Sequence, residues 1–488
     1  MRGDFRWFLL LLVTFAYFHQ GGFANSNARF DLALSIGLDH RYDIDPLAFN
    51  TIDKVRIAGH YYSEKAPGSA YAALPVVIAA SPFVTLDELK QRPRLAEWLL
   101  HLATAASAGL LSALAAVAFR RLLSLLQPAR SHVSSWLITL GVFLGTPLFV
   151  YSTVLFGHAI AAAWLVIGLY AGLKAARLRS AATGYALLGS LALGLAVLTE
   201  YPAILPAAAI AAGVLAVARR PARLLIAGAP AALLPAGLLM LHQYAAFGSP
   251  FAVGYGKLGG TQFATGMSRG FFGIGLPDPV AAAQLLFGTY RGLFVYAPVL
   301  AAAVLGFVFW PRVLRRRLAP ALLGGAAVLW LAIASYTYWQ GGPAFGPRHL
   351  VPAMPLLGLG LAFWPRRRPW NGALAVLVVV SIVVNLVGTA TTPFVSEYIP
   401  APIVSVYPRL AADGAVAINP VSFLTPAAEV DARWDQLQRY PWASFNLGEL
   451  AGLHGWVSLL PLVALWALSA AGPGGRGRRP QPHAPGDA

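Results

Sequence analysis

The sequence predicts an all-α polytopic membrane protein with about twelve transmembrane helices and with juxtamembrane helices in the loops of its outer face. Hydrophobic residues make up 58% of the chain and charged residues only 11%, a balance that water-soluble domains rarely have. Apolar runs of 17 to 22 residues recur along the chain, and each is long enough to cross a hydrocarbon core about 30 Å thick. Basic residues gather in every second gap between these runs.

The apolar runs give the approximate positions of the spans. We expect them near residues 7–24, 97–119, 133–152, 155–173, 181–198, 202–218, 224–244, 292–310, 319–338, 350–364, 370–390 and 451–470. Two shorter apolar stretches, 71–80 and 280–287, cannot cross a bilayer. They predict helices that lie in the membrane interface or pack against the bundle.

The distribution of charge sets the expected orientation. With the N-terminus in the cytoplasm, the cytoplasmic segments hold 21 of the 36 Lys and Arg residues and two of the 19 acids. The outer side then holds 15 cations and 17 acids, which is the asymmetry that the positive-inside rule describes. The sequence therefore predicts a multi-pass inner-membrane protein with both termini in the cytoplasm. Because membrane orientation accounts for the net charge of +17, we expect no nucleic-acid partner.

The two ends of the chain differ in composition. The first span follows Arg6 and is interpreted as an uncleaved signal anchor, because no good small-residue cleavage site comes after it; a cleaved signal peptide is the alternative. Residues 1–470 are expected to form a single transmembrane domain. Residues 471–488 are rich in Gly, Pro and Arg, and predict a disordered cytoplasmic tail. The chain has no Cys, which excludes disulfides and thiolate metal sites.

Three outer segments, 25–96, 245–291 and 391–450, are longer than simple connections need to be. They contain Trp, Tyr and charged residues, whereas disordered segments are poor in aromatic residues. We therefore expect ordered structure on the outer face and a site that opens outward.

Two stretches of the first outer loop form a recognisable pattern. They are Asn27-Ala28-Arg29-Phe30 and, after a helix-like stretch, Gly59-His60-Tyr61-Tyr62-Ser63-Glu64-Lys65-Ala66-Pro67-Gly68. Together they resemble the first periplasmic loop of glycosyltransferase C (GT-C) enzymes, and the lipid A aminoarabinose transferases and protein mannosyltransferases most of all. Segments 146–151 with His158, 290–293 and 345–348 resemble bacterial GT-C-like membrane proteins more generally.

This resemblance implies a GT-C-like transmembrane domain and an inverting glycosyltransferase on the outer face of the bacterial inner membrane. The enzyme would move a sugar from a polyprenyl-phosphate donor to a glycan, lipid or protein acceptor of the cell envelope. Cations would stabilise the negative charge that develops on the leaving phosphate. In the family the Lys of the first loop is implicated in binding the lipid phosphate, and that residue corresponds here to Lys65.

Several residues are expected to bind the substrate. They are Tyr62, Glu64, Lys65, His158, Arg291, Arg348 and His349. The alternative for each cation is that it extends to the headgroups of the outer leaflet. For His158, at a span end, the alternative is a hydrogen-bonded role in helix packing.

The chain departs from the family where a base is needed. The family has an acidic pair after its first span, but this chain has Ser26 and Asn27 there. We therefore expect the catalytic carboxylate to be Asp31, Asp45 or Asp53. The alternative for each is that it is simply a solvated acid of a loop. A further acid, Glu200, is interpreted as marking the end of a span.

No two acids have the spacing of a metal-binding motif, so we expect no cofactor, although a divalent cation is compatible with the family. No Gly-rich phosphate loop or nucleotide-binding βαβ pattern is present, and this disfavours a nucleotide sugar as the direct donor.

Two other classes of function stay open. One is a transporter or flippase of a lipid-linked glycan, which would usually place ionisable groups or broken helices near the middle of the membrane. The other is a catalytically inactive GT-C-like protein of an envelope assembly, and the absence of the acidic pair favours it.

Overall fold

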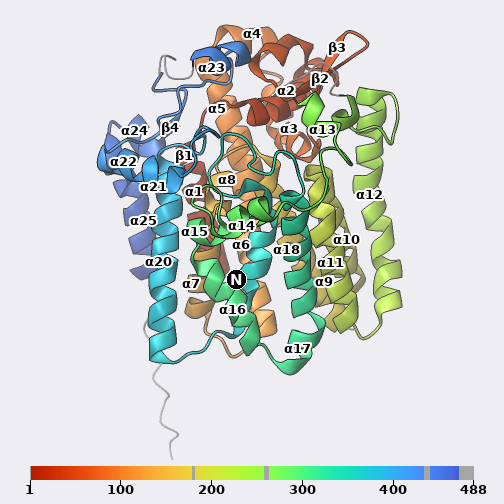
Figure 1. Cartoon of the computed structure of the whole chain (residues 1–488), viewed down its shortest axis with the longest axis vertical. Coiled ribbons are helices and arrows are strands. Elements are labelled where there is room, and N and C mark those ends of the chain that lie inside the picture. The colour runs from red at the N-terminus through yellow and green to blue at the C-terminus, as the bar shows by residue number, and fades with distance from the viewer. Residues whose placement is uncertain (1, 179–181, 258–262, 434–439, 472–488) are drawn as a thin grey trace, which may run out of the picture.

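A computed structural model describes residues 2–178, 182–257, 263–433 and 440–471 (Figure 1). Long helices run from one end of the molecule to the other, and short helices and loops cover the upper end (Figure 1). The predicted disordered tail lies outside the described residues, apart from Ala471. The predicted all-α class is confirmed.

Within the described ranges, six helices are long and apolar enough to cross a membrane. They are α5 (Pro93–Thr104) continued by α6 (Leu110–Leu126), α9 (Gly157–Arg177), α10 (Ala182–Thr199), α12 (Pro221–Phe247), α17 (Arg312–Arg317) with α18 (Ala319–Ala334), and α20 (Arg368–Ala390). The other predicted spans coincide with shorter helices, namely α1 (Arg2–Ala16), α7 (His132–Phe143), α11 (Ile204–Val217), α16 (Val299–Gly306), α19 (Met354–Gly358, between 3-10 turns) and α25 (Leu460–Ala471). The chain is a multi-pass membrane protein.

Two predicted spans end earlier than expected. The first helix stops at Ala16 rather than near residue 24, because Phe18–His19 forms strand β1, which pairs with strand β4 (Phe445–Asn446). The third predicted span breaks at Phe143 and resumes only as the short helix α8 (Leu148–Tyr151). Pro147 lies in this break, and proline cannot continue the backbone hydrogen bonding of a helix.

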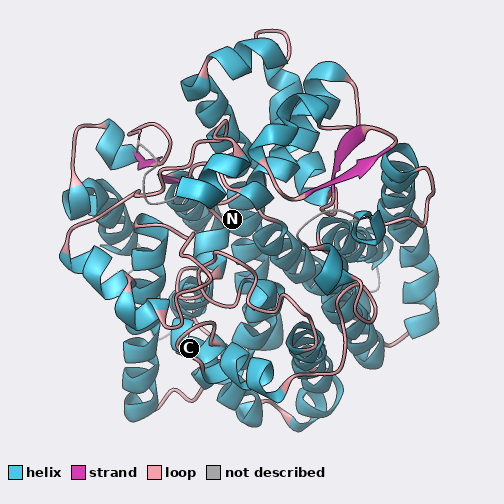
Figure 2. Cartoon of the chain, turned by 45° about the horizontal axis from the view of Figure 1, so that its top comes forward, coloured by secondary structure: helices cyan, strands magenta, loops and turns pink. Residues whose placement is uncertain are grey.

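The upper end of the molecule is built mostly from the first outer loop. It contains α2 (Ala24–Asp39), α3 (Gly68–Ala80), α4 (Leu86–Gln91) and a hairpin of β2 (Lys54–Ile57) and β3 (His60–Ser63). Figure 2 shows this hairpin at the edge of the upper face. The remaining short helices are α13 (Ala264–Met267), α14 (Pro279–Phe287), α15 (Leu293–Tyr296), α21 (Pro402–Ser405), α22 (Tyr407–Ala412), α23 (Ala427–Arg433) and α24 (Leu447–Leu450).

A late segment of the chain holds the first outer loop in place. The backbone N–H of Gly22 donates to Val421 O at 2.9 Å, and Nδ2 of Asn27 donates to Phe423 O at 3.2 Å. The amide of Asn419 donates to Gln20 O at 2.7 Å. Residues 417–423, together with β4, therefore form one structural unit with residues 18–27.

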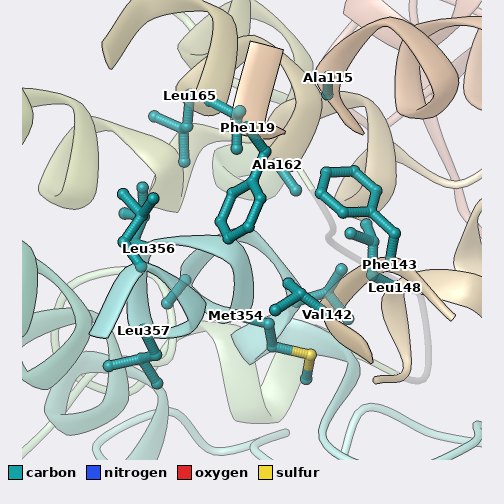
Figure 3. Packing of buried hydrophobic residues seen from close by; sticks show 14 of the residues in the cluster. Ala115, Phe119, Val142, Phe143, Leu148, Ala162, Leu165, Met354, Leu356 and Leu357 are labelled. Atoms are coloured by element: carbon teal, nitrogen blue, oxygen red, sulfur yellow. The ribbon is translucent and has the colours of Figure 1, made fainter. Parts of the chain in front are cut away.

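The core is a continuous apolar cluster between α6, α7, α9 and α19. Figure 3 shows Phe119, Phe143, Leu165, Leu356 and Met354 packed together there. Small residues bring α9 and α10 close together, because a Cβ placed on Gly189 would lie 3.2 Å from the backbone nitrogen of Gly172. Small residues at such contacts are typical of helix pairs in membranes.

The outward surface of the bundle is apolar, and the basic clusters lie away from the outer loops. Leu225, Ile226 and Leu233 of α12 are exposed, as expected of a helix in contact with lipid. The basic helix α17 lies at the lower end in Figure 1, where α20 also begins next to Arg366 and Arg367. The outer loops lie at the opposite end, so the two ends differ strongly in charge.

Candidate functional site

A cavity of about 690 Å³ lies at the loop-covered end of the bundle. Its wall comes from α2, from the first loop, from the start of α9, from the turn after α10, and from segments near residues 255, 340, 397 and 425. The charged residues of this wall are Arg29, Asp53, Glu64, Lys65, Glu200, Arg348 and Glu397. Segments far apart in the sequence therefore bring ionisable groups to one place.

The open end of the β2–β3 hairpin supplies three of these charges. Nζ of Lys65 lies 2.6 Å from Oε1 of Glu64 and 3.1 Å from Oδ2 of Asp53. Burial lowers the pKa of Lys65, but the two carboxylates outweigh burial and raise that pKa above its usual value. Oε2 of Glu64 is buried and has no hydrogen-bond partner among the described residues. Lys65 is thus a charged ammonium group in the cavity wall at neutral pH.

Arg29 links the first loop to the membrane helices. Its guanidinium donates to Oδ1 of Asn25 and Oγ of Ser69, both at 3.0 Å, and to Oε1 of Glu200 at 2.8 Å. Glu200 follows the end of α10, so this ion pair fixes α2 against the bundle.

Arg348 lies where an irregular turn enters a 3-10 helix. Its guanidinium stacks over the ring of Phe156 at 5.4 Å. Its Nε atom is buried without a hydrogen-bond partner, and no acid whose side chain the structure describes, a set that leaves out 431–433, lies within ion-pair distance of it. Buried donors are normally satisfied, so this guanidinium is available to an anion that enters the cavity.

Two histidines stand beside Arg348. The rings of His158 and His349 meet edge to face at 5.4 Å, and Nε2 of each ring is buried without a hydrogen-bond partner in the described part of the chain. Nδ1 of His158 lies 3.6 Å from Glu200. The cavity therefore contains several polar atoms that a ligand with oxygen atoms would satisfy.

Arg291 is fully buried and does not line the cavity. Its guanidinium donates to the carbonyls of Gln340 at 2.9 Å, Gly342 at 2.8 Å and Ala344 at 2.6 Å. These contacts hold residues 340–344, part of which lines the cavity. Arg291 therefore supports the cavity wall without lining the cavity itself.

The three acids predicted to be catalytic lie in different places. Asp53 lines the cavity. Asp31 is completely buried in α2, accepts a hydrogen bond from Asn50 at 3.2 Å, and does not line the cavity. Burial raises the pKa of Asp31 well above its usual value, although the hydrogen bond from Asn50 lowers it. Asp45 lies at the turn end of the hairpin, outside the cavity.

Of the residues predicted to bind substrate, Glu64, Lys65, His158, Arg348 and His349 line the cavity. Tyr62 does not, because its ring packs against Phe247 at 6.3 Å.

A group that could hold a metal ion lies at the turn end of the hairpin. Each of Asp43, Asp45 and His60 offers one ligand atom, and these atoms lie within 4.8 Å of one another. The guanidinium of Arg41 forms an ion pair with Asp43 and lies 3.6 Å from Asp45, so it competes for the same carboxylates. The group is compatible with an optional divalent cation.

Three charged residues of the cavity wall, Arg29, Glu200 and Glu397, were not among the predicted site residues. Arg29 lies inside the first-loop pattern, and its position there was a usable signal. Glu200 was interpreted as the end of a span, yet an ionisable residue at such a depth is itself a signal of function. Glu397 has no recognisable sequence context, and only the fold brings it to the cavity.

No family model matches the chain, and no curated protein matches it. Among solved structures, the chain is similar to ArnT from Cupriavidus metallidurans bound to undecaprenyl phosphate, with a TM-score of 0.47 and 16% identity over 96% of this chain and 73% of that one. It is also similar to the apo form of the oligosaccharyltransferase from Archaeoglobus fulgidus, with a TM-score of 0.41 and 15% identity over 89% of this chain and 60% of that one. The likeness is too distant to transfer the role of any residue to this chain.

Proposed function

We propose that this protein is a glycosyltransferase that moves a sugar from a polyprenyl-phosphate donor to an acceptor on the outer face of the bacterial inner membrane. One observation supports this proposal above all. The guanidinium of Arg348 lacks a carboxylate partner among the described residues, and it lines the same cavity as Lys65, His158 and His349. A phosphate group is an anion that satisfies such a set of donors.

The two cations suit different parts of a phosphate. A guanidinium presents parallel N–H groups that match two phosphate oxygens, whereas an ammonium acts as a point charge. Arg348 would bind the phosphate oxygens directly. Lys65, held between Asp53 and Glu64, would stabilise the negative charge that grows as the bond between the sugar and the phosphate breaks.

The position of the cavity in the bundle favours a lipid-linked donor. His158 opens α9, Glu200 follows α10, and Arg348 precedes the helical segment around α19. The wall thus consists of helix ends and outer loops, the depth at which a phosphate on a membrane-embedded prenyl chain would lie. A transporter would be expected to carry its charges nearer the middle of the spans, so the transferase is the better proposal.

The test is the binding of undecaprenyl phosphate compared with undecaprenol, which lacks the phosphate. Native mass spectrometry of the full-length protein in detergent should detect the phosphorylated lipid on the wild type but little undecaprenol. Arg348→Ala should weaken binding of undecaprenyl phosphate at least about tenfold, since a charge-assisted bond to phosphate is lost.

The matched control is Arg56→Ala, which removes an exposed arginine from strand β2 outside the cavity. This variant should bind undecaprenyl phosphate like the wild type. Equal binding of the two lipids by the wild type, or binding that is unchanged in Arg348→Ala, would contradict the proposal.

A further inference from the structure

The cavity contains one carboxylate that no cation neutralises. Of its four acids, Asp53 and Glu64 contact Lys65, and Glu200 contacts Arg29. Among the residues whose side chains the structure describes, which leave out 431–433, Glu397 has no Lys, Arg or His within ion-pair distance. The wall therefore has an unpaired guanidinium at Arg348 and an unpaired carboxylate at Glu397.

The backbone of Glu397 is held in place by a residue from another loop. The hydroxyl of Tyr290 donates to the carbonyl of Glu397 at 2.7 Å. The next residue, Arg291, donates to the carbonyls of Gln340, Gly342 and Ala344. One dipeptide thus fixes both the segment that carries Glu397 and the turn that faces it.

The unpaired guanidinium and the unpaired carboxylate each lie beside one of two consecutive glycines. A Cβ on Gly341 would lie 2.7 Å from Nε of Arg348, and a Cβ on Gly342 would lie 3.7 Å from Oε2 of Glu397. Both glycines have positive φ, +75° and +63°, which residues with a Cβ rarely adopt. Arg348 and Glu397 therefore flank the same two residues of backbone, and the glycines keep space open beside each of them.

We propose that Glu397 is a catalytic residue, the general base that accepts the proton of the acceptor hydroxyl; this inference rests on the proposed function. The acceptor oxygen forms a bond to the anomeric carbon, and its proton moves to the carboxylate of Glu397. The bond between the anomeric carbon and the phosphate oxygen breaks, and its electron pair stays on the phosphate. The products are the glycosylated acceptor, polyprenyl phosphate and a protonated Glu397, which returns its proton to water.

Position favours Glu397 over Asp53 for this step. Asp53 lies against Lys65, on the side where the leaving phosphate is proposed to bind. An inverting displacement brings the acceptor to the face of the sugar opposite the leaving group, so its base must stand away from that phosphate. Glu397 lies beside Gly342, and among the described side chains no cation pairs with its carboxylate.

The test measures the release of labelled sugar from undecaprenyl-phosphate donors by the full-length protein in phosphatidylethanolamine and phosphatidylglycerol liposomes. The donors carry radiolabelled glucose, mannose, galactose or N-acetylglucosamine, with lipid A, glycerol or water as the acceptor. Glu397→Gln, which keeps the shape of the side chain, should lower kcat by about 10²- to 10⁴-fold, as loss of a general base does. It should leave binding of undecaprenyl phosphate within about twofold of the wild type, because the phosphate contacts lie elsewhere.

A second readout separates chemistry from structure. Glu397→Gln should lower kcat while it leaves the KM for the donor lipid within about twofold of the wild type, a split that general loss of structure would not produce. The matched control is Asp413→Asn, an exposed acid of the same outer segment that does not line the cavity and that should leave both quantities unchanged.

Two results would overturn the inference, and they are distinguishable. Sugar release by Glu397→Gln within about threefold of the wild type would remove Glu397 as the base and leave the proposed function intact. No release by the wild type from any of the four donors would overturn the proposed function, and the role of Glu397 with it.

Discussion

The two ends of the β2–β3 hairpin have similar charged groups in different surroundings. At the open end, Lys65 bridges Asp53 and Glu64 inside the cavity, and its side chain is 12% exposed. At the turn end, Arg41 bridges Asp43 and Asp45 on the surface, and its side chain is 35% exposed. Each end therefore has one cation between two carboxylates, and burial is the main difference between them.

This difference shows why the same residue types have different energetic weight at the two ends. Water and salt screen charges at the surface, so an ion pair there typically contributes less than about 1 kcal/mol. In a buried cluster, removal of one partner leaves the others without compensation.

The largest difference is expected between Lys65→Met and Arg41→Ala. Lys65→Met leaves two carboxylates facing each other in the cavity wall and should destabilise the fold by about 3–5 kcal/mol. Arg41→Ala should cost less than about 1 kcal/mol. Thermal unfolding in detergent, followed by circular dichroism, measures both. If Lys65→Met fails to fold, Lys65→Arg serves as the variant that keeps the positive charge. Similar losses of stability in Lys65→Met and Arg41→Ala would show that burial does not change the contribution of these ion pairs.

Arg348→Ala and Arg56→Ala compare a cation of the cavity with an exposed cation of the hairpin. Loss of one preorganised donor to a developing anion typically lowers the rate by about 10²- to 10³-fold, and we expect this for sugar transfer by Arg348→Ala. Arg56→Ala should transfer sugar at the rate of the wild type. The measurement is the initial rate of sugar transfer in liposomes. A tenfold lower rate in Arg56→Ala would mean that the exposed surface of the hairpin takes part in the reaction.

Gly341→Ala and Gly59→Ala test two glycines that share a positive φ. A Cβ at position 59, in the hairpin turn, would meet no atom within 4 Å, so this variant should lose about 1 kcal/mol from backbone strain alone. A Cβ at position 341 would lie 2.7 Å from Nε of Arg348 and would also displace that side chain. We expect Gly341→Ala to lose sugar transfer as well as stability. Unchanged transfer by Gly341→Ala would mean that the position of Arg348 is unimportant.

The smallest effect concerns Asp45 and acid. Burial raises the pKa of Asp45. Three groups together lower it by more, namely the backbone N–H of Tyr61, the side chain of His60 and the guanidinium of Arg41. The pKa of Asp45 is therefore lower in the folded protein than in the unfolded chain. Asp45 therefore contributes stability above its unfolded pKa of about 3.9, and this contribution is lost as the pH falls through the folded pKa.

The midpoint of thermal unfolding, recorded from neutral pH to about pH 3, measures this contribution. Asp45→Asn should show a shallower fall in stability below about pH 4 than the wild type. Parallel curves for the two proteins would show that the carboxylate of Asp45 is not stabilised by folding.

The sequence predicted the helices well and the cavity only in part. Length and composition suffice for spans, because every backbone group in a lipid environment must be bonded within its own helix. The end of the first helix was missed, because the pairing of Phe18 and His19 with Phe445 and Asn446 is a contact between distant residues. Lys65 and Arg348 stood in recognisable patterns.

Glu397 and the role of Arg291 depend on long-range geometry that no local pattern records. The guanidinium of Arg291 contacts residues about fifty positions later in the chain. A sequence pattern indicates that such a side chain is important, but it does not distinguish a group that binds substrate from one that holds a loop.

The attachment of residues 417–423 and β4 to residues 18–27 has a consequence for biogenesis. The first outer loop leaves the ribosome early, but the backbone partners of Gly22 and Asn27 are made nearly four hundred residues later. The helices between these two regions are therefore synthesised before the contacts of the first outer loop with residues 417–423 can form. The pairing of β1 with β4 therefore forms only after β4 has been synthesised, and a chain stopped before β4 would lack the strand that pairs with Phe18 and His19.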